Sequence, residues 1–199
     1  MPETTTNQPD LESRRTHERS KYLALAEKGW YGKSNHGRHA YDLVRGFVPR
    51  PRFVVDFGCG RNTFIGHLRR LGLDGLGIDF AFPEADLVTP MHRTTLAAGI
   101  ADVVTSFDAL EHLLPEEVDE VIAEMRRVAV PRGRLVVRIS CRPSTNLVGG
   151  EGLHPTVQPL RWWMDKLRTV ATVEQQGIYV VGRFKDVASV GAGGAGGAA

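Results

Sequence analysis

The chain has 199 residues, a formal net charge of +2 and an apolar content of 42%. This length and composition predict one globular domain with a hydrophobic core. The near-zero net charge gives no support for binding to nucleic acid or to an anionic membrane. No apolar run approaches the roughly 20 residues that span a bilayer. The polar start of the chain is unlike a signal peptide, so we expect a cytoplasmic protein.

Composition divides the chain into three regions. Residues 1–19 contain little that can be buried, which predicts a disordered N-terminal tail. Residues 20–187 are the predicted folded domain, and residues 188–199 are a Gly/Ala-rich flexible tail. The chain has two cysteines, Cys59 and Cys141, and no structural disulfide is expected between them in a cytoplasmic protein.

Helical and strand patterns alternate along the predicted domain. Helical spacing at 21–27 and 39–47 precedes a contiguous apolar run at 52–57, which is typical of a parallel strand covered on both faces. We expect helices at 62–71, 116–128 and 160–167, strands at 76–80, 85–88, 102–107 and 134–140, a polar loop at 141–157, and a hairpin over 169–174 and 178–184. Alternation of this kind predicts right-handed crossovers and a mostly parallel sheet.

The most informative stretch is residues 53–60, Phe-Val-Val-Asp-Phe-Gly-Cys-Gly. Its apolar strand turns sharply into a helix, and Gly58 and Gly60 remove the side chains that would keep a ligand from the backbone. The carboxylate of Asp56 then faces whatever lies over the turn. Asp79 ends the next apolar run, about 20 residues further on, where an acid suits a ribose diol. The pattern predicts a site for a nucleoside-type cofactor.

Four motifs in this order resemble the class I S-adenosylmethionine-dependent methyltransferases of the small, single-domain type. They are Val-Val-Asp-Phe-Gly-Cys-Gly at 54–60, Gly-Ile-Asp-Phe at 77–80, Thr-Ser-Phe-Asp-Ala-Leu-Glu-His at 105–112 and Pro-Arg-Gly-Arg-Leu-Val-Val at 131–137. The likeness extends over roughly residues 36–185.

The resemblance implies an α/β, Rossmann-like three-layer sandwich with helices on both faces. Its mostly parallel seven-stranded sheet has the order 3-2-1-4-5-7-6, with the last strand antiparallel. It implies S-adenosyl-L-methionine as cofactor, S-adenosyl-L-homocysteine as product, and Asp56 facing the cofactor's amino group. The expected cofactor-binding residues are Asp56, Gly58, Cys59, Gly60, Asp79, Phe80, Asp86, Ser106 and Phe107.

A third glycine, frequent in the family, is replaced here by Asn62. Asparagine enters the left-handed backbone region more readily than most residues, so the turn tolerates it. A nicotinamide dinucleotide site is the main rival, but its fingerprint needs a glycine where this chain has Thr63. An anion beside the turn also suits a cationic zwitterion better than a diphosphate.

Glu111 and His112 follow the fourth strand and are the candidate catalytic residues. Methyl transfer needs alignment of the acceptor, and a base only where the acceptor must lose a proton. Histidine titrates near neutral pH and can take that proton, although His112 also fits a structural role. One Glu-His pair supplies too few ligands to predict a metal, so none is expected.

Two flanking segments are expected to contact the substrate, because loops at the carboxyl ends of strands meet bound ligands. They are residues 30–37 and 142–163. The candidate substrate residues within them are Lys33, His36, Arg142, His154 and Trp162. The adjacent Trp162 and Trp163 point in different directions on a helix, so at most one of them is expected to face the cleft.

A small-molecule acceptor, a sugar or nucleotide among them, methylated at oxygen or nitrogen, fits the compact chain best. A nucleic-acid methyltransferase remains an alternative, although the chain lacks a basic face and the Asn/Asp-Pro-Pro-Tyr/Phe motif of amino-methylating DNA enzymes. Cys141 lies where some cytosine-modifying enzymes keep a nucleophile, but no second cysteine supports that role. A non-catalytic cofactor-binding partner subunit is the other alternative. We expect a monomer or homodimer without a membrane partner.

Overall fold

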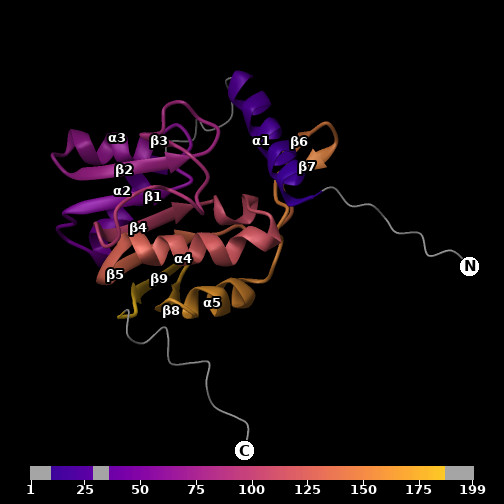
Figure 1. Cartoon of the computed structure of the whole chain (residues 1–199). Coiled ribbons are helices and arrows are strands. Elements are labelled where there is room, and N and C mark those ends of the chain that lie inside the picture. The colour runs from indigo at the N-terminus through magenta and orange to yellow at the C-terminus, as the bar shows by residue number, and fades with distance from the viewer. Residues whose placement is uncertain (1–9, 29–35, 187–199) are drawn as a thin grey trace, which may run out of the picture.

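The computed structural model describes residues 10–28 and 36–186, with the side chains of residues 36–39 left out of the description. Figure 1 shows the elements along the chain. The helices are α1 (Leu11–Glu27), α2 (His36–Phe47), α3 (Thr63–Arg70), α4 (Val118–Val128) and α5 (Leu160–Arg168), with short 3-10 turns η1 (Leu110–His112) and η2 (Pro115–Glu117). The strands are β1 (Phe53–Phe57), β2 (Asp74–Asp79), β3 (Leu87–Val88), β4 (Ala101–Phe107), β5 (Ala129–Arg138), β6 (Leu147–Val148), β7 (Glu151–Gly152), β8 (Ala171–Gln176) and β9 (Tyr179–Phe184).

The main sheet has seven strands in the order β3-β2-β1-β4-β5-β9-β8. The strands from β3 to β5 pair in parallel, whereas β9 runs antiparallel to both of its neighbours. Counted within this sheet alone, the order is 3-2-1-4-5-7-6 with the last strand antiparallel. The predicted fold and strand order are therefore confirmed.

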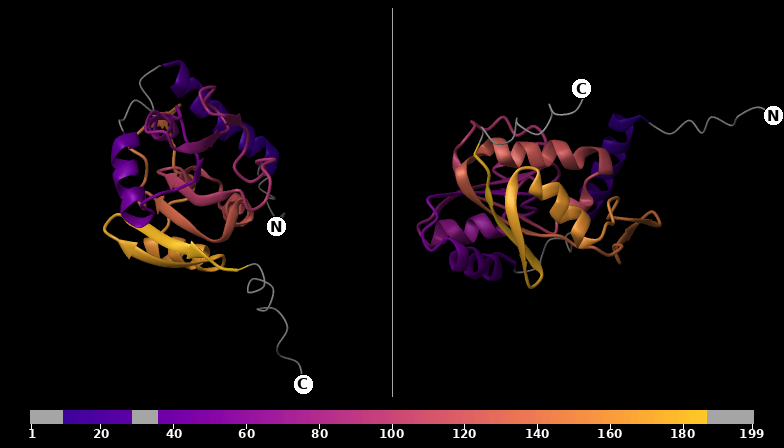
Figure 2. Two further views of the ribbon diagram at one scale, coloured as in Figure 1. Left: turned by 90° about the vertical axis from the view of Figure 1, so that its left-hand side faces the viewer. Right: turned by 90° about the horizontal axis from the view of Figure 1, so that it is seen from below.

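Helices cover both faces of the sheet, which gives three layers (Figure 2). On one face, Val54, Val103 and Val136 pack with residues of α2 and α3 such as Val44 and Leu68. On the other face, the intervening strand residues pack against α4 and α5; these include Val55, Val104, Leu135, Met125, Trp163 and Leu167. Side chains alternate across a strand, so each central strand supplies apolar residues to both layers. This explains the contiguous apolar runs in the sequence.

The C-terminal hairpin forms as expected, with β8 and β9 at one edge of the sheet (yellow in Figure 2). The polar stretch at 141–157 is not entirely loop, because β6 and β7 form a small antiparallel pair of their own within it. Figure 1 places this pair beside α1, beyond the carboxyl ends of the central strands. The predicted C-terminal tail begins at 188 and lies outside the described residues.

Helix α1 requires a correction to the predicted N-terminal tail of residues 1–19. The helix begins at Leu11, and the side chain of Asp10 caps it by accepting a 2.9 Å hydrogen bond from the Ser13 N–H. The charged residues of this segment were the reason for predicting disorder. In the structure they form ion pairs with acids of η2 and α4: Arg14 with Glu116, and Arg15 with Glu117 and Glu120. Residues 1–9 lie outside the described part of the chain.

The inner side of α1 is apolar only near its end, where Tyr22 and Leu25 are buried against Phe82 and Leu153. None of the helices in the described ranges has both the length and the apolar character required to span a bilayer.

Candidate active site

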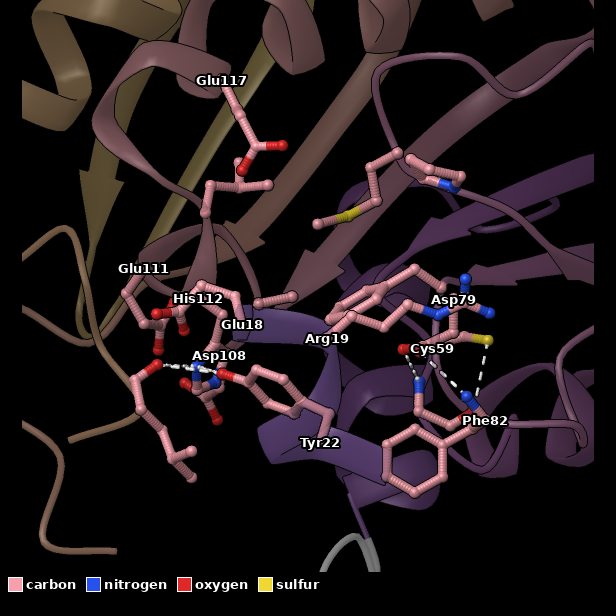
Figure 3. Close-up of a pocket in the computed structure, with 18 of the residues that line it drawn as sticks. Glu18, Arg19, Tyr22, Cys59, Asp79, Phe82, Asp108, Glu111, His112 and Glu117 are labelled. Atoms are coloured by element: carbon pink, nitrogen blue, oxygen red, sulfur yellow. Dashed lines mark hydrogen bonds between the residues drawn. The ribbon is translucent and has the colours of Figure 1, made fainter. Parts of the chain in front are cut away.

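A cavity of about 940 Å³ lies at the carboxyl ends of β1, β2 and β4, beneath α1. Parallel sheets of this type bind ligands at the point where the strand order reverses, here between β1 and β4. The volume is near the upper end of the roughly 300–1,000 Å³ typical of ligand pockets. Figure 3 shows two groups of side chains in the cavity, with Cys59, Asp79 and Phe82 on one side, Glu111 and His112 on the other, and Tyr22 of α1 between them.

The glycine turn after β1 forms the floor of one half of the cavity. Gly58 and Gly60 both have positive φ angles, 77° and 53°, which glycine adopts without strain. The Gly58 and Cys59 N–H groups donate to the Ile78 carbonyl at 2.9 Å, so the turn is tied to β2. Asn62 occupies the N-cap position of α3 without a side-chain cap hydrogen bond; its φ of 58° is the left-handed conformation that the sequence predicted it could adopt.

Asp56 is the only acid of β1 and lies at its buried carboxyl end. Its Oδ1 accepts a 2.6 Å hydrogen bond from the Thr105 hydroxyl, and 4% of its surface is exposed, toward the cavity. Burial raises the pKa of Asp56 to about 7, and the negative charge of Asp79 adds to this rise, while the Thr105 hydrogen bond opposes it. The charged form of a buried carboxyl is destabilised, so a cation placed against it stabilises that form strongly.

Asp79 ends β2 on the same side of the cavity. Its Oδ2 accepts from the Gly60 N–H at 2.9 Å, and its Oδ1 accepts from the N–H groups of Ala81 and Phe82. These bonds fix the carboxylate and leave lone pairs that can accept from a hydroxyl. Burial raises its pKa. The neighbouring Phe80 ring also lines the cavity and contacts the Tyr22 ring edge to face, with centroids 5.4 Å apart.

Glu111 and His112, on the 3-10 turn after β4, form the second group. Glu111 is fully buried; its Oε1 accepts from the Ser140 N–H at 3.0 Å, and its Oε2 has no hydrogen-bond partner among the residues described. Burial raises the pKa of Glu111 to about 7. His112 is half-buried, and its removal from water lowers its pKa to about 4. His112 is therefore neutral at pH 7 and a weaker base than the sequence suggested.

Hydrogen bonds fix the tautomer of His112. Its Nδ1 lies 2.6 Å from the Leu153 carbonyl and also contacts the Tyr22 hydroxyl, which donates to the same carbonyl at 2.9 Å. Because a carbonyl oxygen only accepts, Nδ1 carries the hydrogen, and Nε2 is left with its lone pair.

Most of the predicted cofactor residues lie together around the first half of the cavity. Those lining it are Asp56, Gly58, Cys59, Gly60, Asp79, Phe80 and Phe107. Cys59 is a free, half-buried thiol whose pKa is raised by burial, so it contributes shape rather than reactivity.

The structure places two predicted cofactor residues outside the cavity. Asp86 lies behind the glycine turn, where it accepts from the Gly77 N–H and the Asn62 amide and pairs with Arg69. It supports the turn instead of facing a ligand. Ser106 is fully buried on the opposite face of β4 from Thr105, because side chains alternate along a strand.

Of the predicted substrate residues whose side chains the structure describes, which are Arg142, His154 and Trp162, only His154 lines the cavity. Arg142 is exposed and outside it. Trp162 packs beside the core against Trp163, which is fully buried, so neither ring reaches the cavity. Lys33 lies outside the described residues, and His36 is described only as the first residue of α2. Cys141 is a free thiol, and burial raises its pKa, as expected of an inert cysteine.

Sequence reasoning did not find the contribution of α1. This helix supplies one wall of the cavity, including Arg15, Arg19 and Tyr22, and the loop after β3 supplies Met91 and His92. A short helical pattern at 21–27 was visible, but nothing in it indicated that the helix would lie over the ends of strands far along the chain.

Comparison with known proteins shows that the chain is similar to methyltransferases. A protein-family model described as a methyltransferase domain matches residues 55–137. Among solved structures, the chain is similar to 1,6-didemethyltoxoflavin-N1-methyltransferase of Burkholderia thailandensis, with TM-score 0.70, 16% identity, and coverage of 89% of this chain and 92% of that one. That structure contains 1,6-didemethyltoxoflavin and S-adenosylhomocysteine. A comparison with curated protein sequences finds no match.

Two further solved structures share the fold. The sugar N-methyltransferase KedS8 from a Streptoalloteichus species has TM-score 0.61 and 16% identity over 82% of this chain and 92% of that one. A chain of the complex between the Haloferax volcanii Trm112 methyltransferase activator and a methyltransferase has TM-score 0.64 and 16% identity over 84% of this chain and 97% of that one. These structures share the fold of this chain, and together with the family match they support the resemblance to class I methyltransferases, the class that uses S-adenosyl-L-methionine.

Proposed function

We propose that this protein transfers a methyl group from S-adenosyl-L-methionine to an oxygen or nitrogen atom of a small-molecule acceptor. The observation that carries the proposal is the division of a single cavity into two chemically different halves. One half is lined by the glycine turn, Asp56 and Asp79. The other half is lined by Glu111, His112 and His154. The first half suits the cofactor and the second half the acceptor.

In the cofactor half, Asp56 would pair with the ammonium group of the methionine part, and Asp79 would accept hydrogen bonds from the ribose hydroxyls. Gly58 and Gly60 would let the ligand approach the backbone. Phe80 offers an aromatic face beside this position. The predicted roles of these residues rest on the class resemblance and on their shared position around the cavity.

In the acceptor half, the protein's main task is alignment. A lone pair of the acceptor attacks the methyl carbon, the carbon–sulfur bond breaks, and its electron pair stays on sulfur to give S-adenosyl-L-homocysteine. The donor already carries a good leaving group, so placing the acceptor in line supplies most of the acceleration. Any proton on the attacking atom must also leave. Glu111 lines this half of the cavity, and its buried Oε2 has no hydrogen-bond partner among the described residues, so we propose Glu111 as the proton acceptor.

The size and charge of the acceptor half favour a small molecule. Helix α1 forms a wall over the strand ends, held by the Arg14 and Arg15 ion pairs to η2 and α4. The lining of the cavity carries both signs of charge, with Arg15 and Arg19 beside Glu18 and Glu117. A nucleic acid would be better served by a uniformly basic surface. We expect the protein to act as a monomer or homodimer.

The test is to incubate the protein with methyl-labelled S-adenosyl-L-methionine and either small-metabolite extract or nucleic acid, and to follow the label by mass spectrometry. We expect labelled small molecules and stoichiometric S-adenosyl-L-homocysteine. Label in nucleic acid would identify a nucleic-acid methyltransferase instead. Cofactor binding without transfer to any acceptor would support the non-catalytic partner subunit.

Cofactor affinity should depend on pH through Asp56. Its pKa of about 7 in the free protein means that the carboxyl is largely protonated below that pH, when it can no longer pair with an ammonium group. We expect the dissociation constant, measured by calorimetry, to rise as the pH falls from 8 to 6, by up to about tenfold per pH unit below 7. Sinefungin, which keeps the amino-acid part without the sulfonium, should show the same dependence. A flat profile would contradict the role of Asp56.

A further inference from the structure

The acceptor half of the cavity contains a group of potential metal ligands that the sequence does not bring together. Glu111, His112 and His154 each present a ligand atom, and these atoms lie within 4.8 Å of one another. The two histidine rings meet edge to face with centroids 4.8 Å apart. From this geometry we propose that Glu111, His112 and His154 bind a divalent transition-metal ion that faces the acceptor.

The hydrogen bonds of both histidines are those of metal ligands. Nδ1 of His154 lies 2.7 Å from the Arg142 carbonyl, as Nδ1 of His112 lies 2.6 Å from the Leu153 carbonyl. Each Nδ1 therefore carries a hydrogen, and each Nε2 keeps its lone pair. Metal-binding histidines almost always donate their second N–H to a carbonyl or carboxylate in this way, which fixes the tautomer and the ring orientation.

The third ligand is a buried carboxylate that lacks a counter-charge. Oε1 of Glu111 is held by the Ser140 N–H, whereas Oε2 is buried without a hydrogen-bond partner in the described ranges. No ion pair formed by the described residues includes Glu111, whose side chain is fully buried. Burying an unpaired carboxylate is costly, and a metal ion removes that cost by supplying the missing positive charge.

The backbone around the three ligands is fixed before any ion binds. Leu153 and Thr156, on either side of His154, are buried, and the Thr156 hydroxyl donates to the Leu113 carbonyl at 2.7 Å. The Thr156 N–H donates to the Glu111 carbonyl at 3.3 Å, which ties the His154 loop to the turn that carries the other two ligands.

The fit requires only a small closure. Two ligand atoms that each lie about 2.0–2.2 Å from the same ion are at most about 4.4 Å apart. The candidate ligand atoms of this site lie within 4.8 Å of one another, which is slightly more. His154 is half-buried and stands on a loop, so rotation of its ring can make up the difference. Two imidazoles and one carboxylate favour Zn²⁺ and similar transition ions over Mg²⁺, and leave coordination positions open.

An ion in this place would act on the acceptor, which narrows the proposed function and in that respect rests on it. Glu111 would then hold the ion instead of accepting the acceptor's proton. A hydroxyl oxygen bound at an open position would lose its proton to solvent more easily, because a divalent ion lowers the pKa of a bound hydroxyl. The resulting oxyanion would attack the methyl carbon, with the carbon–sulfur electron pair remaining on sulfur. The acceptor class is then a small molecule with a metal-binding hydroxyl.

The experiment titrates the apoprotein, stripped with a chelator, with Co²⁺ and with Zn²⁺. We expect one equivalent of Co²⁺ to give the visible absorption of a nitrogen- and oxygen-bound ion, and Zn²⁺ to displace it. Glu111→Gln and His154→Gln should each weaken Zn²⁺ binding by at least about a hundredfold, since removing a direct ligand costs more than the tenfold to hundredfold lost with an outer-shell partner. S-adenosyl-L-methionine affinity serves as the folding check and should stay unchanged in both variants.

The matched control is His17→Gln. His17 belongs to a second group with Glu18 and Glu151, and its own side chain is exposed and does not line the cavity. This variant should bind Co²⁺ like the parent. Loss of the signal in His17→Gln with retention in Glu111→Gln would overturn the proposal, as would the absence of stoichiometric binding. If the protein transfers methyl groups but binds no metal ion, the metal site is refuted and the proposed function stands.

Discussion

Replacing Asp56 with asparagine should remove most of the affinity for S-adenosyl-L-methionine while leaving the fold in place. The substitution keeps the shape of the side chain and an oxygen that can accept the 2.6 Å hydrogen bond from Thr105. It removes the charge that would pair with the cofactor's ammonium group. Losing one partner of a buried charge pair costs at least about 2 kcal/mol, which corresponds to a dissociation constant raised by about thirtyfold or more.

Although Asp56→Asn should bind the cofactor more weakly, it should not be less stable than the parent at neutral pH. Because the pKa of Asp56 is higher in the folded chain than in the unfolded one, the carboxyl contributes stability that is complete in acid. That stability is lost as the pH rises from the unfolded value near 4 through about 7. Asp56→Asn carries no charge and escapes the loss. Without cofactor, its melting temperature at pH 8 should therefore equal or exceed that of the parent.

Calorimetry with the cofactor and thermal unfolding without it separate these two effects. Asp74→Asn is the matched control, because Asp74 is an exposed acid at the start of β2, away from the cavity. It should change neither quantity. Normal affinity in Asp56→Asn would refute the cofactor site, and a large drop in melting temperature would show that Asp56 is mainly structural.

The fold was predictable because its signals are local. Apolar runs mark the strands buried on both faces, and the sharp turn at Gly58 and Gly60 marks the cofactor loop. The same reasoning bears on one predicted contact. Asp56, Thr105 and Phe107 share a face of the sheet, so strand alternation places Ser106 on the other face.

The acceptor half could not be predicted, because its signals are long-range. The helix α1 has few apolar residues, and it contacts acids of η2 and α4, far along the chain, through ion pairs of Arg14 and Arg15. His154 likewise joins His112 only because Leu153 and Thr156 fix its loop against the turn after β4. Nothing in the local sequence of either segment reports these contacts.

Three glycine-to-alanine substitutions should separate backbone strain, steric fit and ligand contact in the cofactor loop. Gly58, Gly60 and Gly72 all have positive φ angles, so alanine costs about 1–2 kcal/mol of strain at each. They differ in what the new methyl group meets. At Gly58 it would lie 2.3 Å from the Cβ of Ala109, whereas Gly60 and Gly72 have no atom within 4 Å.

Gly58→Ala should therefore be the most damaging of the three. The Ala109 Cβ is attached directly to backbone and cannot swing away, so the turn or the start of η1 must shift, adding about 1–3 kcal/mol of overpacking to the strain. At about 2–4 °C per kcal/mol for a chain of this size, its melting temperature should fall by roughly 4–20 °C. Cofactor affinity should fall with it, because the same shift displaces the N–H groups that fix the turn.

The two open glycines provide the controls within this series. Gly72 lies at the end of α3 outside the cavity, so Gly72→Ala should show the strain alone, with a smaller fall in melting temperature and unchanged cofactor affinity. Gly60→Ala should melt like Gly72→Ala but bind the cofactor more weakly, because its methyl group enters the space reserved for the ligand. If Gly60→Ala binds the cofactor normally, the ligand does not approach this turn, and the assignment of the two halves of the cavity must be abandoned.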